Sequence, residues 1–210
     1  MTLPTMPLAD ATGLIRQFDL IPNFDGSYTS TTSLEGTRAS FAAASLGLVP
    51  VAAGATDFFT IAAGAKTVKL ARLRITGTAG TLITVPITLL RRPTPTVIGS
   101  ATLATSLALP VAAPLDTADG ASTSTLAAYT TANPTLGGTG AILGSGYLTL
   151  ATTAAATVEN ALDWNFAAVP GARLPTLRGG STQQFVLNLN STAITSPLLQ
   201  IEALWIEDFT

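Results

Sequence analysis

Candidate catalytic side chains are scarce, because the 210-residue sequence contains neither histidine nor cysteine. Most nucleophilic and general-base mechanisms depend on one of these residues, so Ser-His and Cys-His catalysis are excluded. Zinc would need a site built from carboxylates alone, which is improbable. The carboxylates are therefore the remaining candidates for chemistry.

One carboxylate, Asp163, lies beside an aromatic residue, Trp164. A glycoside hydrolase needs two carboxylates about 5 to 9 Å apart, and an aromatic ring can stack on a sugar and raise the pKa of the acid. We favour the simpler interpretation, in which Trp164 and Phe166 are packing residues of a strand and Asp163 lies at its rim or caps its end. Asp116 and Asp119 could bind calcium in a loop, but their spacing fits no EF-hand. We predict no catalytic residue, no metal and no cofactor.

The basic residues are concentrated in one part of the chain, since six of the ten lie within residues 66–92, where no acid occurs. One interpretation is a solvated sheet face whose charge keeps the edge soluble. The other is a contact for an acidic partner, such as the carboxylates near the C-terminus of a neighbouring copy. Glu202, Glu207 and Asp208 are expected to face solvent or an interface. The candidate inter-subunit charge contacts are Arg72, Arg74, Arg91 and Arg92.

The composition favours a surface that other protein chains cover. Charged residues make up 10% of the sequence, whereas soluble domains usually have about 25%. Small neutral side chains lose few water contacts and little rotamer entropy on burial, so we expect a homo-oligomer. The net charge of −2, without any block of like charge, argues against nucleic-acid binding as its main task.

No part of the sequence predicts membrane insertion or secretion. No apolar run reaches the roughly 18 residues of a spanning helix, and the first ten residues lack the basic and apolar regions of a signal peptide. We expect synthesis in the cytoplasm and no membrane partner.

The elements that would position these side chains are strands, and the clearest signal lies in residues 67–92. The parity of the apolar residues slips by one near Ala71, which predicts a β-bulge. Residues 83–89 alternate with the two-residue period of a strand that buries one face. Gly77 and Gly80 would supply the positive φ angles of a tight reversal. We therefore predict a long hairpin at the centre of the domain.

Further alternating segments, separated by turn signals, predict an all-β fold. Seven to nine strands of this kind are typical of a β-sandwich, here most consistent with a jelly roll. The other predicted strands cover residues 39–50, 57–61, 126–130, 141–152, 161–166, 183–190 and 198–209, with weaker ones at 97–98 and 101–109.

Residues 1–38 are predicted to be an extended N-terminal anchoring arm, and residues 39–210 to be the β-sandwich domain. The arm lacks a sustained period, although a short helical turn could cover residues 13–18. Its apolar residues would need a partner surface. The candidate docking residues are Leu14, Ile15, Phe18 and Phe24.

A series of short motifs carries a family resemblance. They lie at residues 57–61, 67–77, 133–137, 162–166, 178–184 and 199–207. In this series the chain resembles small virion-associated proteins encoded among the structural genes of tailed bacteriophages, over about residues 55–208. The resemblance implies a capsid-surface or fibre-type role and brings no catalytic residues.

The leading functional prediction is a non-enzymatic virion component, a capsid decoration or head-fibre protein that forms a homotrimer and binds other virion structural proteins. The alternative is a carbohydrate- or receptor-binding module of a fibre or tail tip, with Trp164, Tyr129 or Tyr147 stacked on sugar rings. A third option is a glycan hydrolase that uses Asp163. Exposed coplanar aromatics would favour sugar binding, and buried aromatics with a large apolar face would favour assembly.

Overall fold

The computed structural model describes the backbone of residues 5–9, 15–22, 28–31, 38–50, 56–152, 160–168, 173–190 and 193–208, and the side chains from residue 39 onward within these ranges. The chain divides into two compact units, residues 1–37 and 38–210. The described residues form strands and two short 3-10 turns, η1 (Ser106–Ala108) and η3 (Phe166–Ala168). The prediction of an all-β protein is therefore confirmed.

The first unit contains a three-stranded antiparallel sheet in the order β1-β2-β3. Its strands are β1 (Thr5–Ala9), β2 (Ile15–Pro22) and β3 (Tyr28–Thr31). The backbone predicted to be one extended arm thus folds back twice. Of the helical turn predicted at residues 13–18, residues 15–18 belong instead to β2, which fits the β-propensity of isoleucine and phenylalanine, and residues 13 and 14 lie outside the described residues.

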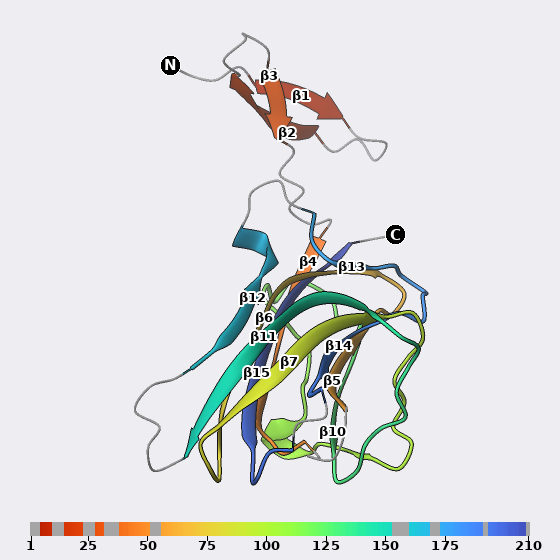
Figure 1. Ribbon diagram of the computed structural model, residues 1–210. Helices are drawn as coiled ribbons and strands as arrows, with labels where there is room; N and C mark the ends of the chain where they lie inside the picture. Colours follow the sequence, from red (N-terminus) through yellow and green to blue (C-terminus); the bar gives the residue numbers. More distant parts are fainter. Residues whose placement is uncertain are drawn as a thin grey trace. The chain divides into compact units, whose positions relative to one another are not determined.

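The second unit is a curled open sheet (Figure 1). Ten strands follow one another in the order β8-β10-β5-β14-β7-β11-β6-β15-β4-β9, and β12 and β13 also pair with β6. The strands are β4 (Arg38–Leu48), β5 (Asp57–Ala62), β6 (Thr67–Ala79), β7 (Ile83–Arg92), β8 (Thr102–Leu103), β9 (Ala113–Pro114), β10 (Thr125–Thr130), β11 (Ala141–Thr152), β12 (Leu162–Asn165), β13 (Thr176–Leu177), β14 (Gln184–Asn188) and β15 (Leu198–Asp208).

The predicted central hairpin is wrong, because β6 and β7 are consecutive in the chain but are not neighbours in the sheet. β11 lies between them: it pairs with β7 from Ala141 to Leu150, and with β6 only at Ala151 and Thr152. The alternation in each arm shows which face is buried, but not which strand lies alongside. Gly77 is still required, since a Cβ atom there would lie 2.5 Å from the carbonyl oxygen of Leu198.

The predicted β-bulge in β6 is confirmed. Opposite β15, Leu204 pairs with Arg72 and Trp205 with Leu70, so Ala71 is the extra residue. The extra residue shifts the side-chain parity. Leucines on both sides of it, Leu70 and Leu73, are therefore buried.

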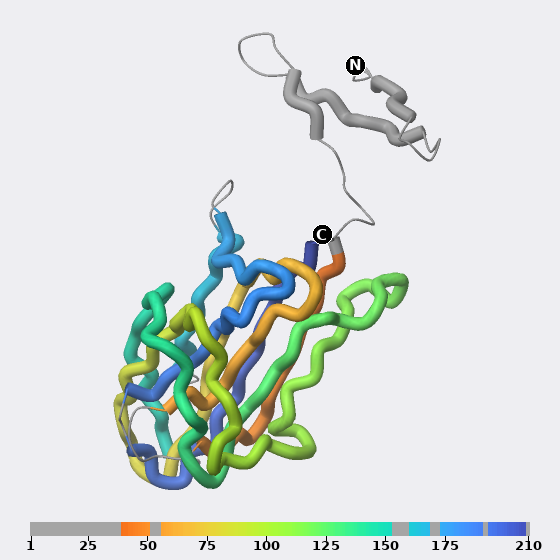
Figure 2. Tube along the Cα trace, turned by 90° about the vertical axis from the view of Figure 1, so that its right-hand side faces the viewer, coloured from red at the N-terminus to blue at the C-terminus, as the bar shows by residue number. Residues whose placement is uncertain are grey.

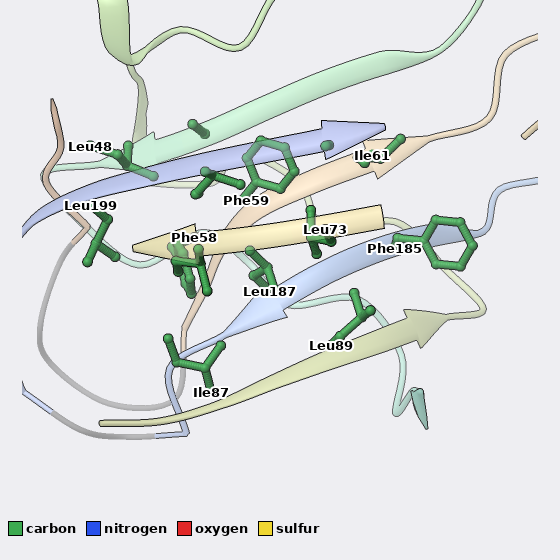
Figure 3. Packing of buried hydrophobic residues seen from close by; sticks show 14 of the residues in the cluster. Leu48, Phe58, Phe59, Ile61, Leu73, Ile87, Leu89, Phe185, Leu187 and Leu199 are labelled. Atoms are coloured by element: carbon green, nitrogen blue, oxygen red, sulfur yellow. The ribbon is translucent and has the colours of Figure 1, made fainter. Parts of the chain in front are cut away.

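The curl of the sheet brings strands from its two ends onto one core (Figure 3). Leu73 of β6 lies against Phe59 of β5, Leu89 of β7 and Leu187 of β14. The indole of Trp205 stacks on Phe41 of β4, with ring centroids 5.9 Å apart. Most of the large apolar residues of these strands face this core, which leaves the outer face and the loops as the places where function must be sought.

Candidate functional site

A buried ion pair joins Asp57 at the start of β5 to Arg92 at the end of β7. The guanidinium donates from Nε and Nη2 to the two carboxylate oxygens, at 2.6 and 2.8 Å. Thr96 Oγ1 and Asn188 Nδ2 also donate to the carboxylate, at 2.5 and 2.7 Å. Both oxygens of Asp57 thus have partners. Arg92, predicted as an inter-subunit contact, is instead buried within the second unit of its own chain.

This network fastens two loops to the sheet. Arg92 Nη1 donates to the carbonyl oxygens of Gly137 and Gly138 at 3.3 and 3.0 Å, and the Gly137 amide donates to Thr96 Oγ1 at 3.0 Å. The Thr96 amide donates to Gln184 Oε1 at 2.9 Å. Such a closed arrangement suits a structural clamp rather than a reaction, because every group in it already has a partner.

A second buried carboxylate, Glu207 of β15, holds the loop that precedes β10. It accepts hydrogen bonds from the hydroxyls of Ser122 and Ser124 at 2.5 Å, and from the amide and hydroxyl of Thr123 at 3.0 Å. Trp205 Nε1 donates to it at 3.2 Å. The expectation that Glu207 faces solvent or an interface is therefore wrong, since its side chain is buried within its own chain.

The electrostatics of Glu207 follow from these donors. Burial alone would raise its pKa, but the hydrogen bonds from Ser122, Ser124, the Thr123 amide and Trp205 outweigh it and lower the pKa to about 2. A carboxylate with so low a pKa remains ionised and cannot serve as a general acid near neutral pH. In this geometry the Glu207 carboxylate anchors the loop that precedes β10.

The other basic residues of β6 pair with carboxylates of the same chain. Lys69 pairs with Asp208, and Arg74 Nη1 lies 3.6 Å from Glu202. These contacts arise because β15 runs antiparallel beside β6. The C-terminal carboxylates thus meet the basic strand, as one interpretation of the sequence suggested, but within one copy rather than between copies.

Asp163, the best sequence candidate for an acid catalyst, is paired with Arg72. The guanidinium donates from Nε to Oδ1 at 3.0 Å and from Nη2 to Oδ2 at 2.5 Å. The hydrogen bond from Arg72 lowers the pKa of Asp163, and that from Asp163 raises the pKa of Arg72. A lowered pKa is the opposite of what a general acid requires.

The three aromatic candidates for sugar stacking lie in different environments. Tyr129 is buried and donates its hydroxyl to the Thr96 carbonyl at 3.2 Å. Trp164 is half-buried and packs against the core, so close to Gly144 that a Cβ atom there would lie 2.4 Å from its Nε1. Only Tyr147, among these three, is well exposed, at 74%. Because Tyr129 is buried and Trp164 packs on the core, the three do not form an exposed platform together.

The loop carboxylates considered for calcium serve the backbone. Asp116 Oδ1 accepts from the amide of Ala118 at 2.9 Å, and Asp119 Oδ2 accepts from the amide of Ser40 at 3.3 Å. Among the described residues, no three Asp, Glu, His or Cys side chains are grouped to hold a metal ion. No helix in the described ranges is long and apolar enough to cross a membrane.

The predicted docking residues of the N-terminal unit cannot be placed by their side chains. Leu14 and Phe24 lie outside the described residues altogether. Ile15 and Phe18 belong to β2, of which the structure describes the backbone only.

The most unusual surface is an apolar strip, which we define as Leu107, Leu109, Val111 and Leu115. The backbone segment that carries the strip, residues 107–115, runs along β4 (Figure 2). It is held there by the pairing of β9 with β4, by a hydrogen bond from Ser45 Oγ to the Ala108 carbonyl at 2.6 Å, and by one from the Leu115 amide to the Ser40 carbonyl at 2.8 Å. Sequence patterns suggested only a weak strand here and did not indicate an exposed face.

Next to the strip lies a shallow groove of about 420 Å3 with a floor of small side chains, which we call the alanine groove. Val111 of the strip lines it, together with the polar side chains of Arg72, Arg74 and Glu202. Its alanines include Ala42, Ala44 and Ala113. A protruding apolar group and a recess that could receive one thus occur side by side on this face.

Comparison with known proteins does not assign the chain to a family. No protein-family model matches the chain, and no curated protein or solved structure matches it significantly.

Proposed function

We propose that the protein is a non-enzymatic structural component of a phage virion, which decorates or projects from the capsid as a symmetric oligomer. The apolar strip and the alanine groove form the contact between its copies. The curled sheet belongs to the jelly-roll type of β-sandwich, with its two facing halves as the two layers.

The observation that carries this proposal is the inverted exposure of the strip. Small residues, Ala108 and Ala112, face the core, while the larger Leu107 and Val111 project outward and are 73% and 65% exposed. A solvent-facing edge of a sheet normally carries charge, not leucine. An apolar patch of this kind is typical of a surface that a protein partner covers.

A second copy is the partner that fits best, because the apolar strip and the alanine groove are two different surfaces that complement each other. A leucine of the strip from one copy can enter the alanine groove of the next, and such a head-to-tail contact closes into a ring if the rotation permits. The sparse charge of the surface lowers the cost of covering it. We propose a homotrimer as the closed assembly, bound to other virion structural proteins.

The carbohydrate- or receptor-binding alternative is less well supported. Sugar sites usually present exposed aromatic rings beside polar groups, whereas Tyr129 is buried and Trp164 packs on the core.

The oligomeric state tests the proposal directly. Light scattering coupled to size exclusion should give about three times the 21.3 kDa mass of one chain. The double variant Leu107→Asp, Val111→Asp should be monomeric and still folded, because both side chains are exposed. Ser100→Asp, an exposed change in a different loop, is the matched control and should leave the oligomer intact. A monomeric wild type, or an oligomer that survives the double variant, contradicts the proposal.

A further inference from the structure

A second groove, of about 810 Å3, is lined by cations from three parts of the sheet, and we call it the basic groove. β13 positions two of them, because Arg173 precedes this strand and Arg178 follows it. The strand is fixed to β6 by the pairing of Thr176 with Lys69. The cations of the groove are Lys69, Arg91, Arg173 and Arg178.

The positive charge of this groove is largely uncompensated. Lys69 pairs with Asp208, but within the part of the chain that the structure describes no carboxylate pairs with Arg91, Arg173 or Arg178, and no acid lines the groove. The other arginines of this unit whose side chains are described, Arg72, Arg74 and Arg92, have carboxylate partners. In a chain with 10% charged residues and a net charge of −2, three unpaired guanidiniums around one groove indicate an anionic ligand.

The rest of the lining narrows the class of that ligand. The walls between the cations are aliphatic, formed by Leu143, Leu174, Pro175 and Ile206, and none of the described residues that line the groove is aromatic. Sugars and single-stranded bases are usually held by aromatic stacking, and a nucleic acid would also need a longer basic track. A polypeptide segment with carboxylate and aliphatic side chains fits both parts of the lining, because its carboxylates can pair with the cations and its aliphatic side chains can pack on the walls.

We propose that the basic groove binds a short acidic and aliphatic segment of a partner protein. Carboxylates of the segment pair with Arg91, Arg173 and Arg178, and its aliphatic side chains pack on the walls. This inference deepens the proposed function, since it states the chemistry of a partner. The inference and the proposed function can fail independently, because the basic groove shares no residue with the apolar strip or the alanine groove.

The test uses the full-length chain and three fluorescent peptides, measured by anisotropy. An octapeptide of alternating glutamate and leucine should bind saturably, and more weakly as salt is raised. Its glutamine–leucine counterpart should not bind, and hexaglutamate should bind about tenfold more weakly, because it lacks the aliphatic contacts. The double variant Arg173→Gln, Arg178→Gln should weaken the first peptide by about tenfold or more. Lys66→Gln removes a cation that lines neither groove; it is the control and should have no effect.

Three results would overturn the inference. The first is no saturable binding of the glutamate–leucine peptide up to about 1 mM. The second is equal binding of the glutamine–leucine peptide, which would make the charges irrelevant. The third is competition by a sulfated tetrasaccharide or by inorganic phosphate at the concentration of the peptide, which would make this a site for small anions. Circular dichroism of the double variant, whose changed side chains are exposed, verifies that it is folded.

Discussion

Replacing Glu207 by glutamine should remove a large part of the acid sensitivity of the fold. In the wild type, the carboxylate accepts hydrogen bonds from Ser122, Thr123, Ser124 and Trp205. A glutamine of the same shape keeps one acceptor oxygen, but its amide group then faces the Thr123 amide, another donor. The hydrogen bonds that anchor the loop before β10 should weaken, while the core stays intact.

The magnitude follows from the pKa of Glu207. A pKa of about 2 in place of the ordinary 4.5 corresponds to about 3 kcal/mol of stability, since one pKa unit is worth about 1.4 kcal/mol. Because the folded-state pKa is the lower one, the unfolded chain binds more protons below pH 4.5. The stabilisation is therefore complete above pH 4.5 and is lost as the pH falls toward 2.

Urea unfolding at a series of pH values, followed by circular dichroism, measures this effect. Glu207→Gln should be less stable than the wild type by about 3 kcal/mol at pH 6, and the difference should shrink steadily toward pH 2. Glu202→Gln, which breaks a half-exposed pair with Arg74, should cost less than about 1 kcal/mol. A Glu207 difference that is the same at pH 6 and at pH 2.5 would refute the reasoning.

Three further predictions concern the clamp, the loop and the N-terminal unit. Arg92→Met should lower the free energy of unfolding by about 3 to 5 kcal/mol because it leaves a buried carboxylate without its cation, whereas Arg72→Met, at an exposed pair, should leave that free energy nearly unchanged in the same denaturation assay. Gly64→Ala should lower the melting temperature, because its Cβ would lie 1.8 Å from a loop carbonyl oxygen, while Gly120→Ala, with no neighbour within 4 Å, should not. Deleting residues 1–38 should leave a folded domain that no longer joins particles, and its continued presence in purified particles by mass spectrometry would contradict the anchoring role.

The sequence by itself determined several long strands of the second unit and the face that each buries. The segment predicted at residues 141–152 is β11 (Ala141–Thr152), and that predicted at 198–209 matches β15 (Leu198–Asp208). The apolar pattern also indicates the β-bulge at Ala71. All of these depend on the alternation of side chains along one strand, which is a local property of the backbone.

Only the tertiary structure decided which strands are neighbours and which charges are buried. β11 separates β6 from β7 because it pairs with β7 over most of its length, and no local pattern records that choice. Glu207 and Arg92 looked like surface charges in the sequence, yet donors and acceptors from distant segments satisfy both of them inside the unit. The cost of burying a charge depends on partners brought together by the fold, so the sequence pattern around either residue could not reveal its place.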